Sequence, residues 1–106
     1  MSAQTASTEN SASGISPGAP WRVKAMSVLP AYQLAITFQD GQSGIVDCSR
    51  IVGAADPGIF APLANADFFA QARLELGAIT WPNGADLDPL WAYEEVTSKK
   101  LWSVPF

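Results

Sequence analysis

A tight turn at Asp40 and Gly41 constrains the fold of this chain more than any other short segment. These two residues separate two apolar stretches, and a two-residue hairpin loop needs positive φ angles, which glycine adopts freely and aspartate tolerates. In the stretch before the turn, large apolar residues alternate with smaller or polar ones: Tyr32, Leu34, Ile36 and Phe38. We therefore expect a strand on each side of the turn, paired antiparallel.

The length of this loop decides the surroundings of Asp47. With a loop of two residues, Ile45 faces Ile36 and Asp47 faces Leu34, which would bury a charge. We expect one of two solutions: a bulge between the strands, or a backbone partner for the Asp47 carboxylate.

Further segments extend the hairpin to a small α+β domain. Residues 22–28 have the pattern of a first strand, and a turn at residues 30–32 connects it to the second, which gives a three-stranded meander. Residues 73–81 predict a second hairpin, and Ser49 and Asn65 are expected N-caps of two short helices between the hairpins. The predicted fold is therefore α+β: a small antiparallel sheet of two hairpin units, with short helices packed on one face.

The segment WPNGADLDP, residues 81–89, is predicted to join the second hairpin to a longer helix. Pro82, Asn83 and Gly84 favour a turn, and Asp88 followed by Pro89 matches an N-cap with proline at the first helical position. The helix is expected over residues 89–100, with an inward face and one surface ion pair: Leu90, Tyr93 and Val96 inward, and Glu95 paired with Lys99.

Length and composition predict one domain preceded by a disordered leader. Residues 1–20 are rich in Ser, Ala, Gly and Pro and carry a single charged side chain, Glu9, so little of this segment can be buried. The chain of 106 residues is 48% hydrophobic, which suffices for one small domain over residues 21–106. The N-terminus has no signal-peptide pattern, and no apolar run approaches the roughly 18 residues that span a bilayer. We expect a cytoplasmic protein without membrane contact.

Charge and residue types exclude several classes of function. The net charge is −4 and the six Lys and Arg residues are scattered, so no basic face is expected for direct nucleic-acid binding. The chain has no histidine, which removes Ser-His-Asp and Cys-His pairs and histidine metal sites. The only cysteine, Cys48, is expected to be a small core residue, with Arg50 its only cationic neighbour. We predict no enzyme activity, no metal and no cofactor.

Two carboxylates of the WPNGADLDP segment are the remaining candidates for chemistry. Asp86 and Asp88 could form an acid and nucleophile pair or an oxygen-ligand cation site. They lack the ligand spacing of a calcium loop, and Asp88 has a capping role, so a structural interpretation is favoured. Asp86 has no such role, and a contact between Asp47 and Asp86 with a raised pKa would favour acid–base chemistry.

Aromatic residues supply the candidates for an interaction site. Trp81, with Tyr93 and Phe38, is expected first of all in the core, although these residues could also line a ligand groove. Trp91 is expected to turn away from the inward face of its helix and to mark an interface. A charged fraction of only 15%, against roughly 25% in soluble domains, leaves apolar surface for a partner.

The C-terminal segment LWSVPF is expected to dock rather than stay in water. In an extended conformation, Trp102, Val104 and Phe106 lie on one side, and Pro105 suits a sheet edge or a groove. We expect a homodimer contact in preference to docking on the same chain. The candidate interaction or ligand residues are therefore Trp81, Asn83, Asp86, Trp91, Trp102 and Phe106.

Two stretches together carry a family resemblance: FQDGQSGIVDCSRIV and PGIFAPLANADFFAQARLELGAITWPNGADLDPLWAY. Over about residues 23–93 the chain resembles the bacterial family called domain of unknown function 2442. The resemblance implies a small α+β domain, sometimes fused to a helix-turn-helix and often encoded beside another small protein, as in toxin and antitoxin pairs. No helix-turn-helix extension is recognisable here, and no catalytic residues can be carried over.

From the resemblance and the missing catalytic equipment we expect a non-enzymatic protein-interaction module. Its expected role is that of the antitoxin-like or regulatory member of a bacterial two-protein system, with the product of an adjacent gene as partner. The alternative is a small ligand-binding protein or enzyme that uses the carboxylates near WPNGADLDP.

Overall fold

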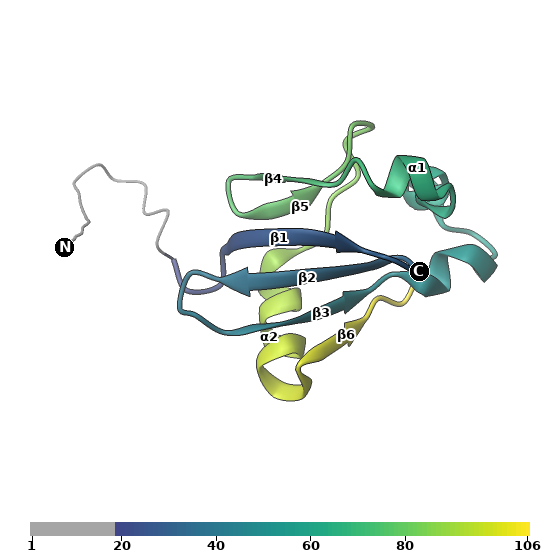
Figure 1. Ribbon diagram of the computed structural model, residues 1–106. Coiled ribbons are helices and arrows are strands. Elements are labelled where there is room, and N and C mark those ends of the chain that lie inside the picture. Colours follow the sequence, from purple (N-terminus) through teal and green to yellow (C-terminus); the bar gives the residue numbers. More distant parts are fainter. Residues whose placement is uncertain (1–18) are drawn as a thin grey trace.

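The computed structural model describes residues 19–106, and Figure 1 shows the arrangement of its elements. Three strands come first, β1 (Val23–Leu29), β2 (Gln33–Phe38) and β3 (Ser43–Asp47), followed by two 3-10 helices, η1 (Ser49–Gly53) and η2 (Gly58–Ala64). Then come α1 (Ala66–Phe69), β4 (Arg73–Glu75), β5 (Ala78–Thr80), α2 (Pro89–Lys99) and β6 (Leu101–Ser103). The fold is α+β, as predicted. The leader predicted for residues 1–20 falls, apart from its last two residues, outside the described part.

The strands form two sheets. The larger has the order β1-β2-β3-β6, with β1, β2 and β3 antiparallel and β6 parallel to β3. β4 and β5 form the second predicted hairpin as a separate two-stranded sheet. The backbone N–H of Val23 donates to the carbonyl of Gly77 at 2.9 Å, so this hairpin lies beside β1 (Figure 1). The two hairpin units are therefore neighbours rather than parts of one continuous sheet.

The loop between β2 and β3 is longer than predicted. Thr37 pairs with Ser43, and inside the loop the Phe38 N–H donates to the carbonyl of Gln42 at 2.7 Å. This shifts the register by one residue from that of a two-residue loop, so Leu34 faces Val46 and Asp47 faces Gln33. The predicted two-residue loop is wrong, and the shift keeps the Asp47 charge off the buried face.

Asp47 also has the backbone partner that its sequence position called for. Its Oδ1 accepts a hydrogen bond from the Ser49 N–H at 2.8 Å. The prediction that Ser49 caps the following helix is wrong, because Ser49 is itself the first residue of η1 and no side chain caps that helix. The N–H of Ser49, which would have no helical partner if Ser49 were the cap, donates instead to the Asp47 carboxylate. At the second helix the prediction is confirmed, since Asn65 Oδ1 accepts from Asp67 and Phe68 at the start of α1.

Helix α2 covers one face of the large sheet. Gly44 permits the close approach, because a Cβ at that position would lie 2.5 Å from the Lys100 carbonyl oxygen and 2.6 Å from Val96 Cγ1. Val96 is buried and Tyr93 is half-buried, as predicted, but Leu90, in the first turn of α2, is exposed, so its predicted inward position is wrong. The predicted ion pair of Glu95 and Lys99 is present at 3.1 Å. The largest fully buried side chains of the core are Trp81, Phe38, Leu34, Ile36, Leu63, Ile79, Val46, Val96 and Cys48.

The C-terminal segment docks on its own chain, which corrects the expected homodimer contact through this tail. Lys100 has a φ of 64°, a left-handed conformation that reverses the chain directly after α2 and leads it alongside β3. The Val104 N–H donates to the Asp47 carbonyl at 2.9 Å, and the Trp102 side chain is 2% exposed. The first three residues of the tail form the edge strand β6, and Pro105 lies after that strand, where it lines a groove. The end of the tail lies next to the helical segment between β3 and β4 (Figure 1). Homodimerisation through another surface stays a prediction.

Candidate functional site

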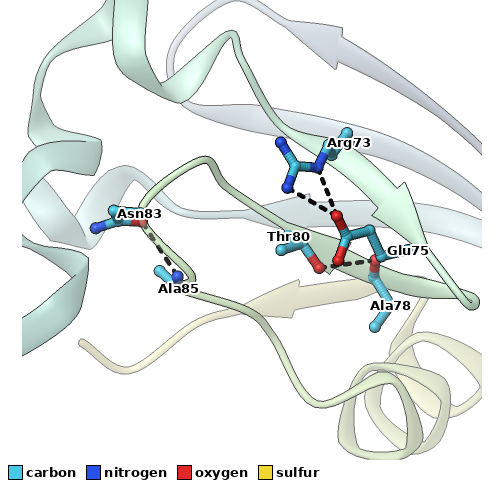
Figure 2. Close-up of polar contacts among 6 residues, drawn as sticks. All are labelled: Arg73, Glu75, Ala78, Thr80, Asn83 and Ala85. Atoms are coloured by element: carbon cyan, nitrogen blue, oxygen red, sulfur yellow. Dashed lines mark hydrogen bonds and ion pairs between the residues drawn. The ribbon is translucent and has the colours of Figure 1, made fainter.

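The WPNGADLDP segment is the structural joint that its turn and cap residues predict. Gly84 has a φ of +89°, a conformation in which an L side chain is strained. Asn83 Oδ1 accepts from the Ala85 N–H at 3.1 Å (Figure 2), and its Nδ2 donates to the Ile59 carbonyl at 2.9 Å. Asp88 Oδ1 accepts from the Leu90 N–H at 3.0 Å, with Pro89 opening α2. The turn and cap place Asp86 and the first turn of α2 at the surface.

The strands that lead into this joint are held by local polar contacts. Figure 2 shows Arg73 paired with Glu75 at 2.7 Å on β4, and the Thr80 hydroxyl donating to the Ala78 carbonyl at 3.3 Å on β5. Thr80 also forms an isolated antiparallel bridge to Asp86. The backbone of Asp86 is therefore tied to the end of the hairpin, while its side chain is exposed.

A groove of about 360 Å³ opens where this joint meets the C-terminal tail and the chain before η2. We call it the aromatic groove. Its lining comes from three parts of the sequence: Asp56, Pro57 and Phe60; Asp86, Leu87, Asp88 and Trp91; and Trp102, Val104, Pro105 and Phe106. Segments more than 40 residues apart in the chain thus share one concavity, of a size that holds a small ligand or a few side chains.

Two aromatic pairs line the groove. Trp91 packs against Trp102 with ring centroids 5.0 Å apart and planes inclined by 46°. Phe60 meets Phe106 edge to face, with centroids 5.3 Å apart. Trp102 is buried, whereas Trp91 is 44% exposed, so the indole of Trp91 is offered to solvent above a buried aromatic partner.

The charged groups of the groove are all negative. Asp56, Asp86 and Asp88 line it and are exposed, and its lining contains no Lys or Arg. Asp88 serves as the cap of α2. Within residues 19–106, no hydrogen bond or ion pair engages the side chains of Asp56 or Asp86. The groove therefore combines aromatic surface with two carboxylates, Asp56 and Asp86, that have no partner in the described part of the chain.

Four of the six predicted site residues meet at this groove: Asp86, Trp91, Trp102 and Phe106. Trp81 does not, because it is fully buried in the core and its indole N–H donates to the Phe69 carbonyl at 3.0 Å. Asn83 is absent from the lining too, and both ends of its side-chain amide hold backbone groups. Asp47 does not line the groove either. The backbone hydrogen bond from Ser49 lowers the pKa of Asp47, so the raised pKa that would favour acid–base chemistry is not found at this residue.

The sequence reasoning missed the part of the groove that comes before and within η2. No functional role was predicted for Asp56, Pro57 or Phe60, which lie between the expected caps Ser49 and Asn65. No local periodicity links these positions to the tail, because they meet it only through tertiary packing. The one usable signal was composition, since a low charged fraction leaves apolar surface to be accounted for.

Reactive groups elsewhere are in unreactive surroundings. Burial raises the pKa of the Cys48 thiol to about 12, so it is protonated at neutral pH and is a poor nucleophile. The Tyr93 hydroxyl donates to Asp40 Oδ2 at 2.5 Å, which lowers the pKa of Asp40 and raises that of Tyr93. Among the described residues, no group of three or more Asp, Glu, Cys or His side chains could hold a metal ion. Within the same range, no helix has the length and apolar character that a membrane crossing requires.

Residues 23–96 match the family model described as protein of unknown function (DUF2442). The chain belongs to this family. The match runs from β1 through most of α2 and includes both hairpins and the joint. Trp102 and Phe106, which line the aromatic groove, lie beyond the matched residues. No curated protein and no solved structure matches the chain at a significant level.

Proposed function

We propose that this DUF2442 protein is a non-enzymatic protein-interaction module whose binding surface is the aromatic groove. The observation that carries the proposal is Trp91, which is 44% exposed at a groove of about 360 Å³ and rests on Trp102. Tryptophan is among the residues that contribute most to binding in protein interfaces, where it is seated in concave, well-packed surroundings. A half-exposed indole with a fixed aromatic neighbour is organised in advance for such a contact.

The available side chains support binding rather than catalysis. The chain has no histidine, and its single thiol is buried and protonated. A serine nucleophile would therefore have no histidine as its base, and the cysteine that a Cys-His pair needs is not ionised. Asp86 and Asp88 lie at the groove, but Asp88 is committed to capping α2.

For the cellular role, we propose the antitoxin-like or regulatory member of a bacterial two-protein system in the cytoplasm. Its partner would be a small protein encoded by an adjacent gene, as the family resemblance implies. The net charge of −4 favours a protein partner over nucleic acid or an anionic membrane surface, both of which would be repelled.

A second function is favoured by the size of the groove and by Asp86. A volume of about 360 Å³ lies within the range of small-molecule pockets, and a carboxylate at its edge would orient a cationic compound. On this alternative the protein binds a small cationic ligand through Asp86.

The decisive experiment measures binding of the full-length chain to the product of the adjacent gene by isothermal titration calorimetry. Trp91→Ala is expected to weaken binding by about 2 kcal/mol, the threshold usual for a dominant interface residue. Val52→Ala is the matched control, because Val52 is an exposed apolar residue on η1 that does not line the groove, and its affinity should equal that of the wild type. Equal affinity of all three proteins would exclude the groove as the binding surface.

A further inference from the structure

We propose that the occupant of the aromatic groove is an extended segment of a partner protein that inserts an arginine or lysine side chain between Trp91 and the carboxylates of Asp56 and Asp86. This deepens the proposed function and rests on it, because it names the chemistry of the segment that the module binds. Three features of the groove support it: its charge, the geometry of its aromatic residues and its position beside a sheet edge.

The negative charge of the groove favours a cationic side chain in the bound segment. Three carboxylates line the groove without a Lys or Arg among the lining residues. Asp56 and Asp86 have no side-chain partner within residues 19–106, so binding a cation there breaks no existing interaction. An anionic segment would meet repulsion from all three groups.

The aromatic residues select the shape of the cationic side chain. Arginine and lysine have an apolar stem that can lie on an indole while the charged end reaches a carboxylate, and a cation over a tryptophan face is itself attracted to the ring. Trp91 is half-exposed and Asp86 and Asp88 lie with it in the groove lining, so one long side chain can meet both kinds of group. Phe60 and Phe106 offer apolar surface for a neighbouring residue of the same segment.

The sheet edge favours an extended conformation of that segment. β6 contributes Trp102 to the groove and is the last strand of the order β1-β2-β3-β6, so in the described part of the chain its outer side pairs with no strand. An extended peptide can hydrogen-bond to such an edge while its alternate side chains enter adjacent pockets.

The chain itself is a poor source for the occupant. Residues 1–18 contain no Lys or Arg, so this segment cannot supply the side chain. At the end of α2, Lys99 pairs with Glu95 and Lys100 Nζ donates to Gln42 Oε1 at 3.2 Å. None of the six Lys and Arg residues, all of which lie in the described part of the chain, lines the groove, so a separate protein segment is the occupant that the groove fits best.

The test uses the full-length ¹⁵N-labelled chain and two capped peptides in NMR titrations. The probe is acetyl-Ala-Leu-Arg-Leu-Ala-amide, and the matched control carries citrulline, the neutral isostere, in place of arginine. The indole N–H signals of Trp91 and Trp102 are expected to move with the arginine peptide, which should bind about tenfold more tightly than the citrulline peptide at low salt. The difference should shrink as salt is added.

Protein variants test the carboxylates. The double variant Asp56→Asn with Asp86→Asn should lower the affinity for the arginine peptide about tenfold, to that for the citrulline peptide. The control double variant, Asp67→Asn with Glu94→Gln, removes the same charge at exposed positions outside the groove and should bind like the wild type. None of these four side chains accepts a hydrogen bond within residues 19–106, so all variants are expected to fold.

The outcomes that contradict the cation proposal can be distinguished from those that also contradict the proposed function. Equal binding of both peptides at the groove overturns the cation proposal and leaves the proposed interaction module standing, as does unchanged affinity of the Asp56 and Asp86 variant. If N-acetylarginine methylamide binds as tightly as the peptide, a small ligand replaces the extended segment. A concentration-dependent shift of the Trp91 signal without peptide makes a second copy the occupant. Groove signals that move with neither peptide, while the adjacent-gene product binds elsewhere, overturn both proposals.

Discussion

Trp81 begins the WPNGADLDP joint and Trp91 follows its last residue by two positions, but the two tryptophans differ in burial. Trp81 is fully buried, packs against Phe69 with ring centroids 5.7 Å apart, and has its indole N–H bonded to a backbone carbonyl. Trp91 rests on Trp102 but keeps 44% of its surface in solvent. The Trp81 side chain lies in a closed core with its polar atom paired, whereas Trp91 lies in an open groove where Asp56 and Asp86 have no side-chain partner within residues 19–106.

This difference separates residues that stabilise the domain from residues available for binding. A closed aromatic site stabilises the fold through burial and packing, so substitutions there lower the free energy of unfolding. An open site has exposed apolar surface and charge, so substitutions there lower stability less and also weaken the binding of a partner. The four predictions below test this division, from the largest expected effect on stability to the smallest.

Trp81→Ala is expected to lower the free energy of unfolding by about 4 kcal/mol, because it leaves a cavity and removes the hydrogen bond from the indole N–H to the Phe69 carbonyl. Trp91→Ala should lower it by about half as much, since part of that indole is already in water. Urea denaturation followed by circular dichroism measures both. Equal losses would show that the two regions do not differ in packing.

Gly44→Ala tests the contact that brings α2 onto the sheet. Its Cβ would lie 2.5 Å from the Lys100 carbonyl oxygen, so the helix end must shift, at an expected cost of about 2 kcal/mol. Gly53→Ala is the control, because a Cβ there meets nothing within 4 Å. Thermal unfolding compares the two. A Gly44 variant as stable as the Gly53 variant would contradict the close packing of α2.

Asp88→Ala tests the boundary between the closed and open regions. It removes the cap of α2 and is expected to lower the free energy of unfolding by about 1 kcal/mol. Asp86→Ala, two positions away, removes a side chain that makes no hydrogen bond within residues 19–106 and should leave stability unchanged within about 0.5 kcal/mol. Denaturant unfolding distinguishes them. Equal stability of both variants would remove the structural role of Asp88 and favour a purely functional one.

The smallest effect concerns the link between α2 and the β2–β3 loop. The hydrogen bond from Tyr93 lowers the pKa of Asp40 below its usual 3.8, so the folded state is favoured while the carboxylate is ionised. This contribution is present above the unfolded pKa and is lost as the pH falls through the lowered folded value. Melting temperature should therefore fall more steeply on acidification for the wild type than for Asp40→Asn. Parallel curves would contradict the link.

Local features of the fold could be predicted because they depend on interactions within a few residues. The caps at Asn65 and Asp88, the i,i+4 pair of Glu95 and Lys99 and the two hairpins all follow from adjacent side chains and turn-forming residues. The loop at Asp40 and Gly41 was placed correctly, but its length was not, since several hairpin loops accept an Asp-Gly pair and burial selects among them.

The candidate site was only partly predictable. Asp86 and Trp91 were singled out because no local structural role explained them, and both lie at the groove. Asn83 was singled out on the same segment, but its amide is used by Ala85 and by Ile59, which is 24 residues away. Phe60 could not be found, because only its contact with Phe106 gives it a place in the groove.

From the sequence alone follow the α+β class, the two hairpins, the capped helices and the exposure of Trp91, because strand alternation, turn conformation and capping act between near neighbours. The tertiary structure alone decided the register that places Asp47 off the core, the docking of the tail beside β3 and the meeting of residues 56–60 with residues 102–106. These features depend on which distant surfaces fit together, and apolar burial, which drives them, carries no direction along the chain.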